Sequence, residues 1–307
     1  MTLAAFLREA SNHPFGDGRI ARWRQRALAF AERHTSHGPL ESAAETAWSA
    51  GHRMRSVGGP ALAALIAYRL FVWLLPLALV VVFVVGLWRT EPIDYERAID
   101  QFGIAGYVTA SISQGTASAG GPGLISGLVV GGVVLLYMTY ALVRALRAVH
   151  SLIWRLPFSK VPSPLRTSCV TLLLLVGIVL SRGAFDGVRD AVGPLLGFPV
   201  LVGSYLLVPV LWVLVARHLP HRGDSWRDLV PGALLLTVAS SAIHAVVVLV
   251  LFPYLEQKQD TYGALGLAAG IMLGLYALGW SIAASAALNA ELVDRRREAK
   301  LALDSPA

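Results

Sequence analysis

The chain has 307 residues, of which 55% are hydrophobic and only 15% are charged. A soluble domain carries roughly 25% charged residues, so the composition excludes an ordinary soluble protein. The formal net charge of +7 would suit a nucleic-acid binder in water, but excess Lys and Arg are also typical of the cytoplasmic loops of membrane proteins. We favour the second interpretation and expect no nucleic-acid partner.

Residues 1–58 are predicted to form a cytoplasmic tail that contains a basic amphipathic helix. They hold eight arginines and no apolar run of the signal-peptide type. Within residues 19–34, apolar and arginine side chains fall on opposite faces of a helix, as in helices that lie in an anionic membrane interface. The alternative is a helix packed on the protein's own cytoplasmic side. The interfacial interpretation predicts anionic membrane lipids as partners at the cytoplasmic face.

Six apolar runs follow, and each approaches the ~20 residues that a helix needs to cross a hydrocarbon core of ~30 Å. They predict an all-α fold, a polytopic membrane helix bundle with six transmembrane helices. The runs cover residues 60–88, 123–143, 165–181, 199–216, 231–253 and 263–288. We assign residues 59–292 to the transmembrane domain and residues 293–307 to a cytoplasmic C-terminal tail.

The basic residues orient these spans. The two tails and the even-numbered loops hold 20 Lys and Arg residues, whereas the odd-numbered loops hold five. Cytoplasmic loops carry the excess of Lys and Arg, so both termini are predicted to lie inside.

Glycines recur at four-residue intervals in two of the spans. This spacing places small residues on one helix stripe, where they allow the close backbone contact that membrane helices use for association. The alternative is the general abundance of glycine in membrane helices. The predicted packing glycines are Gly123, Gly127, Gly131, Gly266, Gly270 and Gly274.

Five polar residues near the spans are candidates for a substrate site or cavity. Arg69 follows Tyr68 about seven residues inside the first span, where a charge either snorkels to the interface or faces a polar cavity. His244 lies in the fifth span and is either a helix–helix hydrogen bonder or a proton relay. Asn289 and Glu291 lie at the cytoplasmic end of the sixth span, and Glu291 is a candidate ion-pair partner for Arg69.

Signals for catalysis are poor. The two histidine pairs, at residues 34 and 37 and at residues 218 and 221, join no acid or cysteine cluster of the metal-ligand type. The sequence also has no phosphate loop of the Walker type and no nucleophile elbow. We therefore expect no catalytic residue, no metal and no cofactor.

Several segments in the same order resemble the YihY/BrkB family of bacterial inner-membrane proteins. The stretch 61–76, ALAALIAYRLFVWLLP, is similar to the family's first span, and 228–239, DLVPGALLLTVA, to its "PGA" entry to the fifth. Residues 262–266, YGALG, and 288–292, LNAEL, resemble the entry and the close of its sixth. Arg69 departs from the pattern, because many relatives have an uncharged residue there.

The resemblance implies six spans with both ends inside, in the bacterial inner membrane. Members were once mislabelled ribonuclease BN, and they have been linked to envelope integrity, serum resistance and export of lipid-like envelope components. The leading hypothesis is a transporter or flippase for an amphipathic or anionic envelope molecule. The rivals are a non-transporting membrane scaffold and, last, a membrane-bound nuclease. A homo-oligomer is compatible with all three.

Overall fold

The computed structural model describes residues 39–88, 121–157, 168–174, 176–177, 203, 206–251, 253–254 and 259–304. Within these ranges the chain forms helices, turns and connecting segments and no strand, which confirms the all-α prediction. The amphipathic helix predicted at residues 19–34 lies outside them.

The principal helices occur in the order of the predicted spans. A shorter apolar helix, Leu206–Arg217, lies in the region of the predicted fourth span and precedes η3. The labelled elements are α3 (Pro39–Ser56), α4 (Gly59–Trp88), α7 (Gly121–Ile153), the 3₁₀ helix η3 (Trp226–Leu229), α9 (Val230–Val246), the π-helical segment η4 (Val247–Leu251) and α11 (Gln259–Asp304).

Four stretches in the described part of the chain are long and apolar enough to cross a membrane, so the protein is a multi-pass membrane protein. They are Gly59–Val84, Ile125–Ile153, Trp226–Leu251 and Ala268–Leu301. The predicted spans 165–181 and 199–216 are described only in part, so the count of six stays a prediction.

Two of the helices extend well beyond the apolar runs that predicted them. The second run was expected to end at residue 143, but α7 continues to Ile153, and α11 passes the expected domain boundary at residue 292 without a break. Hydropathy marks where side chains change polarity, whereas a helix continues until a cap or turn ends it. Gly58 provides such an end between α3 and α4, with a φ of 77° that suits glycine.

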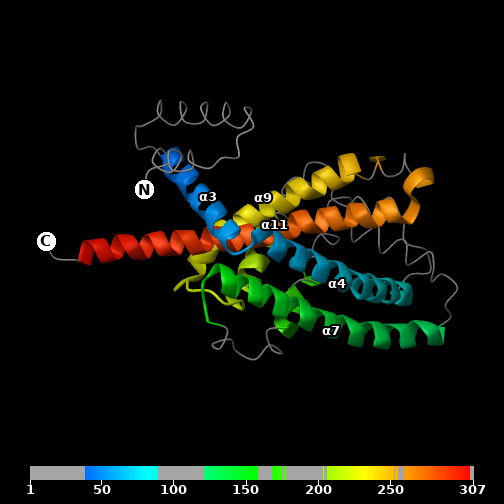
Figure 1. The fold of residues 1–307 in the computed structure, drawn as a ribbon. Coiled ribbons are helices and arrows are strands. Elements are labelled where there is room, and N and C mark those ends of the chain that lie inside the picture. The colour runs from blue at the N-terminus through cyan, green and yellow to red at the C-terminus, as the bar shows by residue number, and fades with distance from the viewer. Residues whose placement is uncertain are drawn as a thin grey trace. The chain divides into compact units, whose positions relative to one another are not determined.

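The chain divides into two compact units, residues 1–52 and 53–307, and the membrane helices belong to the second. In this unit α11 contacts α4, α9 and α7, and α4 also packs along α7. Figure 1 shows α11, coloured orange to red, with α9 and α4 beside it, and α7 next to α4. Alanines at positions 63, 283, 287 and 290 are completely buried, so the helices approach closely along α11.

Two of the predicted packing glycines in α7 lie against α4. A Cβ at Gly127 would overlap the ring of Phe83, and one at Gly131 would lie 3.2 Å from Cγ2 of Val80. A buried hydrogen bond joins the same two helices, because Nε1 of Trp73 donates to Oγ1 of Thr139 at 2.8 Å. In α11, Gly270 and Gly274 are buried and Gly266 is half-buried, whereas the surroundings of Gly123 lie outside the described side chains.

The basic segments meet at one end of the second unit. Arg53, just before α4, forms an ion pair with Asp294 of α11. An Nη2 of Arg222 donates to the carbonyl of Arg155 at the end of α7, and one of Arg297 donates to the carbonyl of Arg222, both at 2.6 Å. The beginnings of α4 and α9 and the ends of α7 and α11 therefore share a side, and the assignment of that side to the cytoplasm stays a prediction.

Candidate functional site

Two of the segments singled out in the sequence, 228–239 and 288–292, meet at the start of α9. Helix α9 begins after Leu229, whose own side chain caps nothing. Asn289 of α11 supplies the cap instead: its Oδ1 accepts from the backbone N–H of Gly232 at 2.7 Å, and its Nδ2 donates to the carbonyl of Leu229 at 3.2 Å. Asn289 is buried, and both ends of its amide are engaged by backbone. We call this contact the Asn289 clamp.

Glycine is required on the other side of the clamp. A Cβ at Gly232 would overlap the amide of Asn289 and the carbonyl oxygen of Ser285. A similar approach occurs at Gly279, where a Cβ would lie 2.5 Å from the carbonyl oxygen of Ala63 in α4. The four-residue glycine spacing missed both positions, since neither belongs to a stripe. The signal that could have found Gly232 is its place in the PGA segment, opposite LNAEL.

A cavity of about 230 Å³ lies between α4, α9 with η4, and α11. We call it the membrane cavity. Apolar side chains make most of its wall, and Ser240 and His244 of α9 are its polar lining residues. The hydroxyl of Ser240 donates to the carbonyl of Thr237 at 3.0 Å. The remaining lining residues are Leu70, Trp73, Leu74, Ile243, Val247, Gly274, Leu275 and Leu278.

The helical ladder changes beside this cavity. After His244 the α-helical pattern gives way to the π-helical turn Val247–Leu251, and the N–H of Val247 is shared between the carbonyls of His244 and Ile243. Segments of π-helix occur often at functional sites, where they re-aim side chains and leave backbone groups less firmly paired. Of the five predicted site residues, His244 is the one that lines the membrane cavity.

Arg69 and Tyr68 directly precede a cavity-lining residue in the chain, but neither of them lines the membrane cavity. Their neighbour Leu70 is a lining residue, whereas Tyr68 is 55% exposed and the Cζ of Arg69 lies 5.8 Å from the centroid of its ring. The Nε of Arg69 is buried and has no hydrogen-bond partner in the described structure. Arg69 is thus a cation with a partly unsatisfied donor, one position before Leu70 in the chain.

The suggested ion pair between Arg69 and Glu291 is not formed. Glu291 accepts from Nε of Arg295 at 3.1 Å, one turn further along α11. This local pairing is the expected one, because residues four apart on a helix are neighbours and need no second helix to meet. Asn289 and Glu291 are thus engaged by the backbone of α9 and by Arg295, respectively.

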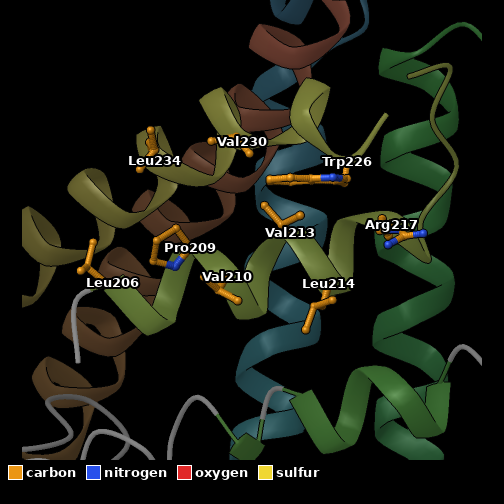
Figure 2. Close-up of a pocket in the computed structure, with 9 residues that line it drawn as sticks. All are labelled: Leu206, Pro209, Val210, Val213, Leu214, Arg217, Trp226, Val230 and Leu234. Atoms are coloured by element: carbon orange, nitrogen blue, oxygen red, sulfur yellow. The ribbon is translucent and has the colours of Figure 1, made fainter. Parts of the chain in front are cut away.

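A second hollow lies between the helix Leu206–Arg217 and the η3–α9 segment. It is an apolar groove of about 480 Å³, and we call it the Arg217 groove. Figure 2 shows Arg217 and Trp226 at one end and Leu206 and Leu234 at the other. Between them lie Pro209, Val210, Val213, Leu214 and Val230. None of the site residues predicted from the sequence lies in this groove.

Across the described ranges, no group of three or more His, Cys, Asp and Glu side chains is placed to hold a metal ion. In the histidine pair at residues 218 and 221, one ring nitrogen of each residue contacts the nearby backbone. Nδ1 of His218 and Nδ1 of His221 each lie 2.8 Å from a backbone carbonyl oxygen.

Comparison with protein families finds a match to a family described as virulence factor BrkB, over residues 50–306. The match includes every element from α4 to α11 and all the segments on which the resemblance was based, which confirms that resemblance. No curated protein and no solved structure matches the chain.

Proposed function

The chain belongs to the virulence factor BrkB family, and we propose that it is a six-span inner-membrane protein, with both termini inside, that moves a lipid-like envelope molecule between leaflets. The molecule would be amphipathic or anionic. The proposal assigns no catalytic residue and no cofactor, and it ranks transport above a nuclease activity.

The membrane cavity is the observation that carries this proposal. A transported amphiphile needs polar groups within the spanning region, and the membrane cavity offers two of them. Polar side chains inside a membrane are costly and commonly mark a transport path, and Ser240 and His244 meet that description. The cavity is smaller than the ~300–1,000 Å³ of ordinary ligand pockets, so under this proposal it widens during transport.

Arg69 supplies the charge that an anionic headgroup would need. Its buried Nε lacks a partner in the described structure, and its neighbour Leu70 forms part of the cavity wall. Adjacent helix residues point about 100° apart, so under this proposal the guanidinium reaches the cavity through its long side chain or through a turn of α4 of that size. Arg69→Gln is therefore expected to slow transport while leaving the melting temperature of the purified protein unchanged.

The rival function is a scaffold, and the Asn289 clamp favours it. The clamp and the contact of Gly279 with Ala63 hold α11 tightly against α9 and α4, as a rigid structural bundle requires. Transport and scaffold differ in one measurable respect, which is whether the purified protein alone moves lipid.

The test is a flipping assay with the full-length protein in liposomes. Anionic lipids with a fluorescent headgroup are incorporated, and a membrane-impermeant reductant bleaches those that reach the outer leaflet. Without flipping, only the labelled lipids of the outer leaflet, half of the total, are bleached. The wild-type protein should raise the bleached fraction above half. Ser240→Phe, which fills the membrane cavity, should return it to that half.

Val238→Phe is the matched control, because Val238 lies on the same helix, is 70% exposed and does not line the cavity. It should behave as the wild type does, and both variants should keep their melting temperatures. Bleaching limited to half for every anionic lipid, with folded wild-type protein present, would reject transport of such lipids and favour the scaffold.

Topology is tested independently with reporter fusions. Fusions at residues 45 and 300 should give a cytoplasmic signal, and one near residue 110 should give an extracytoplasmic signal, because the basic segments are predicted to lie inside. An outside signal at either terminus would refute the proposed orientation.

A further inference from the structure

We propose that the Arg217 groove is a binding site for a phospholipid with an anionic headgroup, with one acyl chain along the groove and the phosphate at Arg217. This site is separate from the membrane cavity. Its occupation does not depend on transport, because a lipid bound here would be retained by a scaffold as well.

The dimensions of the groove suit one lipid chain. One wall follows the helix Leu206–Arg217, and at 1.5 Å per residue its eleven steps extend about 16 Å. This is about half of the ~30 Å hydrocarbon core, which is the depth of a single leaflet. The volume of about 480 Å³ also falls in the ~300–1,000 Å³ range of ligand pockets. The groove therefore matches an acyl chain that runs from the interface to the middle of the bilayer.

The walls have the polarity that this orientation needs. From Leu206 to Leu214 the helix presents only apolar lining side chains, and the facing wall adds Val230 and Leu234 of α9. Many of these side chains are exposed; Val210, for example, is 56% exposed. The groove is thus open along its side, so a lipid could enter it from the bilayer.

The positive charge lies at the end where a headgroup would be. Arg217 is exposed and makes no ion pair with any residue that the structure describes. Arg227 lies close by, with its Cζ 5.7 Å from the centroid of the Trp226 ring. Of the nearby acids, Asp228 pairs with Arg296 at 2.7 Å and Asp224 lies 3.4 Å from Arg297. The two arginines are therefore left with positive charge to offer a phosphate.

Trp226 indicates that the Arg217 end of the groove lies at the membrane interface. Tryptophan is enriched where the hydrocarbon core meets the headgroups, because its ring is apolar and its N–H is polar. Trp226 is 52% exposed and lines the groove beside Arg217 (Figure 2). An apolar channel, an interfacial indole and an unpaired cation follow one another in the order of a lipid's chain, glycerol and phosphate.

The test uses native mass spectrometry of the full-length protein, delipidated and then mixed with dioleoyl phosphatidylglycerol or dioleoyl phosphatidylcholine. The wild type should bind phosphatidylglycerol more tightly. Arg217→Gln should weaken that binding about fivefold, the effect of one basic residue near an anionic lipid. Arg144→Gln is the matched control: Arg144 is an exposed arginine on α7, beside Tyr140, that does not line the groove, and it should leave binding unchanged.

A second measurement locates the lipid without relying on a variant. Vesicles of phosphatidylcholine that contain phosphatidylglycerol with a diazirine in its acyl chain are irradiated with the wild-type protein present. Adducts should concentrate in residues 206–217 and 226–234, and Val210→Trp, which fills the groove, should remove them. Val133→Trp, at an exposed position of α7, should not.

Four results would overturn the proposal. The first is equal binding of the two lipids, and the second is an equal loss in Arg217→Gln and Arg144→Gln, which would indicate only a diffuse positive field. The third is the absence of adducts in the groove. Fourth, if a dimer is found and Val210→Trp converts it to a monomer, the groove holds a second copy of the chain instead of a lipid.

Discussion

Replacing Gly232 by alanine tests the Asn289 clamp with the smallest change available. The new Cβ would overlap both the amide of Asn289 and the carbonyl oxygen of Ser285. The Ser285 contact is backbone of α11 and cannot rotate away, so α9 and α11 must separate or the start of α9 must shift. The hydrogen bond from Gly232 to Asn289, 2.7 Å in the native protein, would be lost in either case.

The magnitude follows from three contributions. Overpacking a buried contact costs about 1–3 kcal/mol. Loss of a hydrogen bond between membrane helices adds about 0.6 kcal/mol and at most about 1.7 kcal/mol. Alanine is the better helix former by up to about 1 kcal/mol, which acts in the opposite direction. We expect Gly232→Ala to lower the free energy of unfolding by about 1–3 kcal/mol, since the steric contribution is the largest.

The measurement is equilibrium unfolding of the purified protein in mixed micelles of a mild detergent and dodecyl sulfate, followed by circular dichroism. Gly132→Ala is the control, because Gly132 lies in helix α7 and a Cβ there meets nothing within 4 Å. It should be as stable as the wild type or slightly more so. Equal stability of Gly232→Ala and Gly132→Ala would refute the clamp.

A double-mutant cycle identifies the partner. Asn289→Ala removes the amide that the new Cβ would overlap, but it leaves the carbonyl of Ser285 in place. The double variant should therefore lose less free energy of unfolding than the two single variants lose together. The difference should be about 0.5–3 kcal/mol, as for residues in direct contact. Strict additivity would show that Gly232 and Asn289 act independently.

Three further predictions concern the other helix contacts. Gly127→Leu should greatly reduce the folded yield in size-exclusion chromatography, because its side chain would displace the ring of Phe83 between α7 and α4, whereas Gly132→Leu should not. Trp73→Phe should cost about 0.6–1.7 kcal/mol in the same unfolding assay, by losing its hydrogen bond to Thr139; an unchanged midpoint would mean that this bond adds nothing. Asp294→Asn should lower the melting temperature more than Glu291→Gln, because Asp294 neutralises the buried Arg53 from another helix whereas Glu291 pairs within its own turn; the reverse order would contradict this assignment.

The sequence by itself determined the fold class and the family. Long apolar runs must become helices in a bilayer, because lipid cannot hydrogen-bond an exposed backbone. This rule depends only on composition along the chain, so it predicted the positions of α4, α7, α9 and α11 correctly. The segments around Tyr68, Gly232 and Asn289 carried the resemblance, which the family match over residues 50–306 then confirmed.

The tertiary structure decided which of the polar residues act together. Depth along a span can be read from the sequence, but the direction of each helix face cannot, and both are needed to place side chains opposite each other. Depth alone allowed Arg69 to meet Glu291, whereas the structure pairs Glu291 with Arg295 and leaves Arg69 outside the lining of the membrane cavity.

The Arg217 groove illustrates the same limit. Arg217 and Trp226 are ordinary residues of a predicted cytoplasmic loop, and no motif singles them out. They line one hollow only because the helix Leu206–Arg217 lies against η3 and α9 at a particular rotation. Such a rotation results from the packing of side chains between helices, which is a property of the assembled bundle and of no single span.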